Sequence, residues 1–287
     1  MKKIILILFI SSKLLSQNQA NNDIRLIIQA DDIGFCHAVN RACIDVYKQG
    51  IARSVEVIVP SPWFMEAASM LAQNPGYDVG VHLCLTSEWT NIKWRPMTEA
   101  KTLRNPDGYF CPFIWPGDIL PKNAGNYLLE NKVDVAEVEK EFRAQIETAK
   151  KYIPQLSHLT GHMGCINATP EITEIVKKLA KEYGLYFGEL NKTKYGGQWS
   201  GSDKSPEQKE AAFIELLKTL QPGNTYHVVE HPGYDVEEMQ SILHKGYENV
   251  ALDRHGVTKT WTSDKVKKVI NERNIKLISV KEAYSSK

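Results

Sequence analysis

Short apolar runs alternate with amphipathic stretches along most of this chain. The first run, Arg25 to Ala30, lacks the regular polar positions of a half-exposed strand, which predicts a strand buried on both faces. Apolar residues at helical spacing follow over 39–47, and Gly50 supplies a helix stop. Further strands are predicted at 54–59, 78–85, 156–160, 185–189, 225–230 and 276–279. Further helices are predicted at 63–73, 135–152, 170–183, 205–220, 236–245 and 264–273.

The alternation of strand and helix predicts the fold class. It is typical of a parallel sheet whose strands are joined by crossover helices. About seven strands in about 260 residues favour a closed or nearly closed barrel over an open doubly wound sheet. We therefore expect an α/β fold, a single-domain irregular (β/α) barrel that is TIM-barrel-like, with mostly parallel strands. Residues 86–134 interrupt the pattern, and a stretch of that length without periodicity is usually functional.

The first residues have the character of an export signal. Lys2 and Lys3 form a basic segment, and the apolar run 4–10 is too short to span a bilayer. We expect a signal peptide over 1–20, a mature domain over 21–287, and a periplasmic or extracellular location. The alternative is a cytosolic protein with an apolar N-terminal extension.

Composition narrows the choice of partners. The chain has 35 Lys and Arg against 34 Asp and Glu, a net charge of +1, so it lacks the basic surface typical of nucleic-acid-binding proteins. We expect no nucleic-acid partner. The five cysteines are an odd number without a C-x-x-C pair, which is not the pattern of a disulfide scaffold. Buried thiols are expected for most of them.

Polar residues stand at the ends of several predicted strands. Asp31 and Asp32 follow the first strand, and His82 lies within the third. Because the C-terminal ends of parallel strands meet at one face of a barrel, we expect such side chains to converge. The later candidates at strand ends are His158, His162, Glu230 and His231.

These residue types suit a metal-dependent hydrolase. One carboxylate with two neutral imidazoles is a common set of zinc ligands, tolerated by other divalent ions such as Mg²⁺. Adjacent carboxylates such as Asp31 and Asp32 project to different sides of the chain, so one can bind the metal while the other accepts a proton. His231, held by a Pro-Gly turn, suits protonation of a leaving amine. The set points to hydrolysis of an amide or an ester.

Each of these features also has a purely structural interpretation. An Asp-Asp pair ahead of a helix is commonly a turn or a cap. A histidine in an apolar strand, as at His82, is more often a hydrogen-bonded core residue, and His231 is equally consistent with a hydrogen-bonded turn. His158 and His162 are four residues apart around Gly161, without the helical context of H-E-x-x-H. Only the combination of these features favours a metal site.

Five sequence motifs together resemble the YdjC-like carbohydrate deacetylases, a family that includes the chitooligosaccharide deacetylases. They occur in the family's order and span nearly the whole chain after the N-terminal segment. Each motif is weak by itself, but the combination is specific. The motifs are IIQADDIG at 27–34, VNR at 39–41, DVGVHLCLT at 78–86, HLTGH at 158–162 and HPGY at 231–234.

The resemblance implies a barrel that removes N-acetyl groups from amino sugars or oligosaccharides with a divalent metal ion, Zn²⁺ or Mg²⁺. By position, it implies that Asp31 is the general base and that Asp32, His82 and His162 hold the metal. His231, in the family's H-P-G segment, would protonate the leaving group or bind the intermediate. The implied partner is an acetylated sugar, without a membrane span, and the chain is compatible with a homodimer.

The chain also departs from the family pattern. The family often shows H-x-D-x-H-x-H, whereas Thr160 replaces the aspartate here and Gly164 stands in place of the last histidine. Metal binding is retained through His162, but the support of the ligands and the recognition of the sugar are expected to differ. The participation of His158 and Arg254 is left open by the sequence.

Two other functions are compatible with these residues. An esterase acting on O-acetyl groups of glycans would use the same ligands. A non-catalytic carbohydrate-binding barrel would use aromatic residues at its mouth, although such a module needs no base at Asp31. The candidate aromatic residues are Trp63, Trp89, Trp94, Tyr109 and Trp115.

Overall fold

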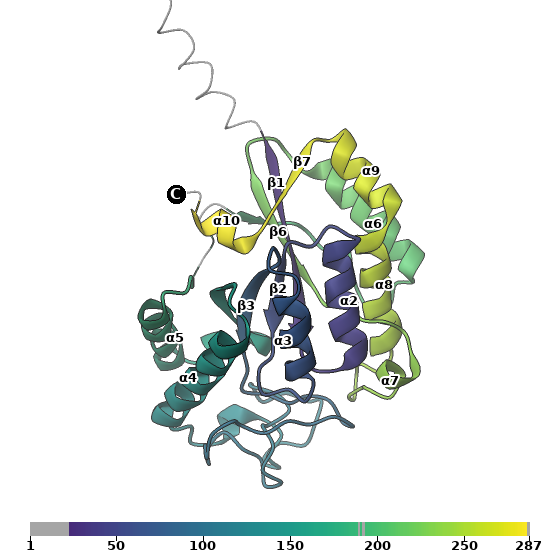
Figure 1. Ribbon diagram of the computed structural model, residues 1–287. Helices are drawn as coiled ribbons and strands as arrows, with labels where there is room; N and C mark the ends of the chain where they lie inside the picture. The colour runs from purple at the N-terminus through teal and green to yellow at the C-terminus, as the bar shows by residue number, and fades with distance from the viewer. Residues whose placement is uncertain (1–22, 189, 191–192, 286–287) are drawn as a thin grey trace, which may run out of the picture.

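The sheet is built around strand β1 (Ile24–Ile33) in the computed structural model, which describes residues 23–188, 190 and 193–285 (Figure 1). Strand β6 (Thr225–Glu230) pairs along one edge of β1. The other edge is shared, with β7 (Ile275–Ile278) along the first residues of β1 and β2 (Ser54–Val57) along the last. Nine of the ten residues of β1 are buried, which explains its continuous apolar sequence.

The order of the strands confirms the predicted fold class. The sheet runs β4-β3-β2-β1-β6-β5, with β7 paired to β1, and every strand pair is parallel. Among the described residues, β4 and β5 do not pair with each other, so the curled sheet remains open on that side and forms an irregular half-barrel. The three strands not yet bounded are β3 (Asp78–Leu83), β4 (Leu156–Gly161) and β5 (Thr193–Tyr195).

Helices cover the outside of the sheet, and several begin at side chains that cap them (Figure 1). Thr169 accepts a hydrogen bond from the first turn of α5, and Ser205 and Gln208 form a capping box at the start of α6. The helices are α2 (His37–Lys48), α3 (Phe64–Ala72), α4 (Val135–Tyr152), α5 (Pro170–Tyr183), α6 (Pro206–Thr219), α7 (Glu237–Gln240), α8 (Val250–Thr262), α9 (Asp264–Glu272) and α10 (Val280–Ser285), and the 3-10 turns are η1 (Leu128–Glu130) and η2 (His162–Asn167).

Two of the predicted elements are wrong. Of the strand expected at 185–189, the described residues 185–188 form only a single bridge, between Tyr186 and β4, and Gly188 has a φ of 110°, which ends the extended conformation. The next strand of the sheet is instead β5. The helix expected at 236–245 is the four-residue α7, and a longer helix, α8, follows where none was predicted. The sequence of α8 hid it because polar side chains, including Arg254 and Thr258, lie on its buried side.

Residues 86–134, which lack a helix or strand period, form a packed connection between β3 and α4. The only regular element that the structure describes within them is η1. The segment is held by its own aromatic residues, since Trp89, Trp94 and Phe110 are buried in the core. It lies at the end of the sheet where the strands deliver their C-terminal residues (Figure 1).

Three further predictions concern the chain as a whole. The expected signal peptide, residues 1–20, lies outside the described residues. All five cysteines belong to the described part of the chain and are buried free thiols, in line with the expectation for most of them. Among the described helices, none combines the length and apolar character needed to cross a bilayer.

Candidate metal-binding active site

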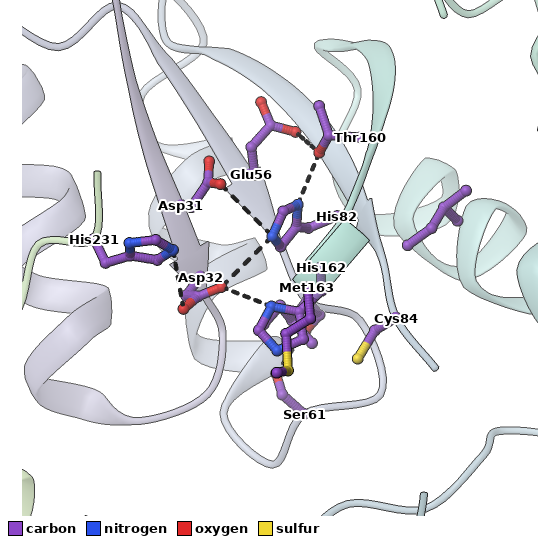
Figure 2. Close-up of polar contacts among 12 residues, drawn as sticks. Asp31, Asp32, Glu56, Ser61, His82, Cys84, Thr160, His162, Met163 and His231 are labelled. Atoms are coloured by element: carbon purple, nitrogen blue, oxygen red, sulfur yellow. Dashed lines mark hydrogen bonds and ion pairs between the residues drawn. The ribbon is translucent and has the colours of Figure 1, made fainter. Parts of the chain in front are cut away.

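Asp31 and Asp32 lie at a bulge near the C-terminal end of β1. The register with β2 shifts between Ala30 and Ile33, and Asp32 has a left-handed φ of 76°. Adjacent side chains of a regular strand point to opposite faces, whereas this bulge turns both carboxylates toward one histidine. Nε2 of His82 lies 3.7 Å from Asp31 Oδ2 and 3.6 Å from Asp32 Oδ1 (Figure 2). Both carboxylates thus serve one site, although strand geometry had predicted different sides.

Asp32, His82 and His162 form a compact group of potential metal ligands. Their ligand atoms all lie within 4.8 Å of one another, and all three residues are buried. Asp32 Oδ1 lies 3.6 Å from His82 Nε2 and 3.2 Å from His162 Nδ1 (Figure 2). The three ligands come from the ends of β1 and β3 and from the first residue after β4. The fold thus brings together the three residues that the sequence assigned to the metal.

The hydrogen bonds of this group fit a divalent cation. Asp32 Oδ1 is buried and has no hydrogen-bond partner, although two imidazole nitrogens face it. The other imidazole nitrogens are occupied, with Glu88 Oε2 3.1 Å from His162 Nε2 and Thr160 Oγ1 2.8 Å from His82 Nδ1. Burial, together with the charge of His162, lowers the pKa of His82 to about 3, so the His82 ring is neutral. Burial opposes protonation of His162, but Glu88 and Asp32 raise its pKa, so a cation bound here would displace a proton from that ring. This donor set suits Zn²⁺ or another divalent ion.

Arg254 neutralises Asp32 through the second carboxylate oxygen. Its Nη2 donates a hydrogen bond to Asp32 Oδ2 at 2.8 Å, and its guanidinium lies 5.0 Å and 5.3 Å from the ring centroids of Phe35 and Trp89. Burial opposes ionisation of Asp32, but the charges of His162 and Arg254 hold its pKa well below the usual range. Asp32 is therefore an anion with one oxygen fixed by Arg254 and the other facing the imidazoles.

Asp31 has the opposite electrostatic character. Its Oδ1 accepts a hydrogen bond from Gln29 Nε2 at 2.8 Å. Burial raises the pKa of Asp31 to about 7; His231 lowers it, while the negative charges of Glu56 and Asp32 add to the rise. A carboxyl group that titrates near neutral pH can both accept and release a proton under ordinary conditions. This property distinguishes Asp31 from Asp32, whose pKa is held well below the usual range.

His231 occupies the solvent side of the group, directly after β6. Its side chain is 40% exposed, and its Nε2 lies 3.9 Å from Asp32 Oδ2 (Figure 2). The other ring nitrogen lies 3.6 Å from Glu230 Oε2. Burial opposes protonation of the ring, but Asp32 and Glu230 together raise its pKa above the ordinary value for histidine. His231 is therefore placed where a group that enters from solvent can reach it.

One candidate from the sequence, His158, lies outside this group, and two carboxylates near the site, Glu88 and Glu56, were not among the candidates. His158 is buried behind the ligands, 2.6 Å from Glu56 Oε1 and 2.7 Å from Ser157 Oγ. Glu88, the partner of His162, belongs to the segment without periodicity and gave no signal in the sequence. Glu56 did give one, since a lone carboxylate in a buried apolar strand requires a partner. Arg254, left open by the sequence, is in direct contact with the site.

Four of the five candidate aromatic residues divide into two groups, and the fifth, Tyr109, is half-buried with the Arg95 guanidinium 4.1 Å from its ring centroid. Trp89 and Trp94 are buried in the core and are not accessible to a ligand. Trp115 is 49% exposed and Trp63 is 39% exposed. The Trp115 ring lies against the loop that follows His162, because a Cβ built on Gly164 would be 3.2 Å from the ring. Trp115 thus borders the loop after His162, and the glycine at 164 leaves room for it.

Comparison with known families settles the relationship of the chain. The sequence profile of the family described as "YdjC-like protein" matches residues 25–272, which include every residue of the ligand group. The chain belongs to the YdjC-like family.

Curated relatives of this YdjC-like protein share one name. A carbohydrate deacetylase of Thermus thermophilus is 36% identical over 160 residues, which are 56% of this chain and about half (51%) of that protein. Carbohydrate deacetylase 2 of Listeria innocua is 26% identical over 89% of this chain and 97% of its own length. A carbohydrate deacetylase of Halalkalibacterium halodurans is 30% identical over 78% of this chain and 90% of its own.

Solved structures share the fold of this YdjC-like protein. A protein from Enterococcus faecalis V583, provisionally named for cellobiose-phosphate cleavage, superimposes with a TM-score of 0.68 and 24% identity over 92% of this chain and 98% of its own. A peptidoglycan N-acetylglucosamine deacetylase superimposes with a TM-score of 0.51 and 12% identity over 95% of this chain and 97% of its own. At these identities, the similarity establishes a common fold alone.

Proposed function

We propose that this YdjC-like protein is a metal-dependent hydrolase that removes N-acetyl groups from amino sugars or their oligosaccharides. The observation that carries the proposal is the environment of Asp32 Oδ1, a buried oxygen without a hydrogen bond that faces one nitrogen each of His82 and His162. Asp31 and His231 flank this group as a carboxylate and an imidazole of suitable pKa. The shared name of the curated relatives supports an acetylated carbohydrate as substrate.

The residues around the ligand group divide the work of hydrolysis. A divalent cation held by Asp32, His82 and His162 would polarise the acyl carbonyl and acidify water. Asp31, with a pKa near neutral, accepts the proton of the attacking water. Arg254 keeps Asp32 ionised and prevents its Oδ2 from competing as a second base.

His231 completes the reaction by protonating the leaving group. An amine leaves an amide poorly unless it receives a proton, whereas an alkoxide leaves an ester with less assistance. The raised pKa of His231 keeps a proton available on the side of the site that faces solvent. This observation favours an N-acetyl group over an O-acetyl group as the bond that is hydrolysed.

The rim of the site supports a sugar as the substrate. Trp115 lies against the loop that carries His162 and presents half of its side chain to solvent. An exposed indole ring offers a flat apolar face on which a sugar ring can stack. The buried positions of Trp89 and Trp94 remove part of the basis for a purely sugar-binding barrel.

The N-terminal sequence supports export as part of this proposal. Lys2 and Lys3 precede a short apolar run, which is the pattern of a signal peptide. Sequencing the N-terminus of the protein recovered from the periplasm or medium tests export. Recovery only of the uncleaved chain from the cytosol would contradict it.

The function is tested by acetate release from N-acetylglucosamine oligomers. The wild type is expected to release acetate in the presence of a divalent metal, and Asp31→Asn is expected to lose at least about 100-fold of this activity because it lacks the base. Asp264→Asn is the matched control, since the Asp264 side chain is 98% exposed and remote from the site. Absence of acetate release by the wild type with Zn²⁺, Mg²⁺ and other divalent metals would overturn the proposal.

A further inference from the structure

Thr160 connects the metal ligand His82 to a carboxylate on another strand. Its Oγ1 lies 2.8 Å from His82 Nδ1 and donates a hydrogen bond to Glu56 Oε2 at 2.5 Å (Figure 2). Both partners of Thr160 Oγ1 are themselves buried, His82 with 4% and Glu56 with 0% of its surface exposed, so the connection is shielded from solvent. We propose that Glu56 and Thr160 act together to position His82 for the metal. The inference rests on the proposed metal site and assigns two residues that support it.

The direction of the hydrogen bonds fixes the tautomer of His82. The hydroxyl of Thr160 has one proton, and the Glu56 carboxylate can only accept it. The hydroxyl oxygen must then accept a hydrogen bond from His82, so the ring proton lies on Nδ1. The unprotonated Nε2 is consequently the nitrogen that faces Asp32 Oδ1 at 3.6 Å. Without the acceptor at Glu56, the hydroxyl could turn and donate to Nδ1, which would leave a proton on the metal side.

The strands are arranged so that Glu56 can reach Thr160. Glu56 on β2 is level with Gly80 on β3, and Gly80 is level with His158 on β4. A Cβ on Gly80 would overlap the Glu56 carboxylate and lie 2.6 Å from His158 Nε2. Glycine at this position therefore opens a gap through which Glu56 extends across β3 to β4.

The position of the Glu56 carboxylate is fixed from its far side. Its Oε1 lies 2.6 Å from His158 Nε2, and His158 Nδ1 lies 2.7 Å from Ser157 Oγ. Ser157 in turn donates to Asp78 Oδ1 at 2.5 Å. Glu56 is fully buried, and both of its carboxylate oxygens have hydrogen-bond partners. The arrangement gives His158 a role as the residue that holds Glu56.

The inference predicts a specific series of metal affinities. Zn²⁺ is titrated into the chelator-treated full chain, with a competing chromophoric chelator as reporter and no substrate present. Thr160→Val, which keeps the shape but removes the hydroxyl, is expected to weaken Zn²⁺ binding about 10–100-fold. Glu56→Gln is expected to weaken it less, because the amide oxygen can still accept the Thr160 hydroxyl but lacks the negative charge of the carboxylate. Thr160→Ser is expected to bind like the wild type. Thr219→Val, on the exposed end of α6, is the matched control.

A carboxylate at position 160 should reverse the effect of the change at position 56. Thr160→Asp supplies the direct partner of His82 but places it beside the Glu56 carboxylate, and the two negative charges repel each other. Glu56→Gln is therefore expected to strengthen Zn²⁺ binding in the Thr160→Asp background, although it weakens binding in the wild-type background. A residue with only a structural role would weaken binding in both backgrounds.

The outcomes separate this inference from the proposed function. If Thr160→Val and Glu56→Gln both bind Zn²⁺ as tightly as the wild type, or if Glu56→Gln weakens binding equally in both backgrounds, the positioning role is wrong while the metal site stands. If the wild type binds neither Zn²⁺ nor another divalent metal, the metal site itself is wrong and the inference falls with it. Should Glu56→Gln fail to fold, Thr160→Val and Thr160→Ser decide the question, because they leave the contact between Glu56 and His158 intact.

Discussion

Nη2 of Arg254 donates a hydrogen bond to Oδ2 of Asp32 at 2.8 Å, joining residues 222 positions apart in the chain. Both groups are buried, so each charge depends on the other. We predict that Arg254→Met destabilises the metal-free protein by about 3 kcal/mol, because it leaves a buried carboxylate without its main hydrogen-bond donor. Denaturant unfolding in the presence of a chelator measures this change.

The double variant Asp32→Asn/Arg254→Met is the control for that experiment. It removes both charges, so it is expected to lose less stability than Arg254→Met alone. If the free energy of unfolding of Arg254→Met lies within about 0.5 kcal/mol of the wild-type value, Arg254 does not compensate the buried charge of Asp32.

Asp31 predicts a pH dependence of the stability of the metal-free protein. Its folded pKa is raised to about 7, whereas an unfolded aspartate titrates near its ordinary pKa of 3.8. A raised carboxyl pKa gives stability at low pH that is lost as the pH rises from the unfolded to the folded value. Between pH 4 and pH 8, the wild type is therefore expected to lose on the order of 3 kcal/mol relative to Asp31→Asn. The test is to measure the free energy of unfolding of both proteins across this pH range. Parallel plots of that free energy against pH would contradict a raised pKa for Asp31.

His231 predicts a dependence on the leaving group. His231→Asn is expected to reduce turnover of an N-acetyl sugar by about 10²–10⁴-fold, because the departing amine no longer receives a proton. An activated aryl acetate, whose leaving group needs no proton, should be affected far less. Equal losses on both substrates would assign His231 to binding rather than to proton donation, and an unchanged affinity for Zn²⁺ would confirm that the ligands are intact.

Trp115 predicts a contribution to sugar binding. Trp115→Ala removes an exposed ring beside the His162 loop and is expected to raise KM for an N-acetylglucosamine oligomer about 5-fold with little change in kcat. Ile119→Ala is the matched control, since Ile119 is also exposed and lies in the same segment. A KM that is the same for both variants and the wild type would remove Trp115 from the binding surface.

Sequence alone predicted the elements whose burial follows a simple period. α4 and α5 have the expected bounds, and β6 likewise, because their apolar positions follow the helix or strand period without interruption. α8 was missed because the residues that it buries include Arg254, which the site requires. A pattern based on hydrophobicity does not detect a helix whose inner face binds a carboxylate.

In the candidate site, too, the sequence predicted some residues and gave no sign of others. Asp32, His82 and His162 were predicted because parallel strands bring their C-terminal ends together and because the motifs match a family. The contact of Glu88 with His162 was not predictable, since it joins the ligand to a segment without periodicity. The bulge at Asp32 and the gap at Gly80 were also invisible, because they depend on backbone geometry and strand register rather than on residue type.

The most direct test of the account is acetate release from N-acetylglucosamine oligomers by protein that has been stripped of metal and then reloaded. Deacetylation releases acetate and a free amine in equal amounts. Both products are measured for the untreated, stripped and Zn²⁺-reloaded wild type and for Asp32→Asn. The deacetylase activity of the wild type is expected to be lost on stripping and to return on reloading. Asp32→Asn is expected to be inactive at the same Zn²⁺ concentration. Full activity of the stripped wild type, or of Asp32→Asn, would contradict the account.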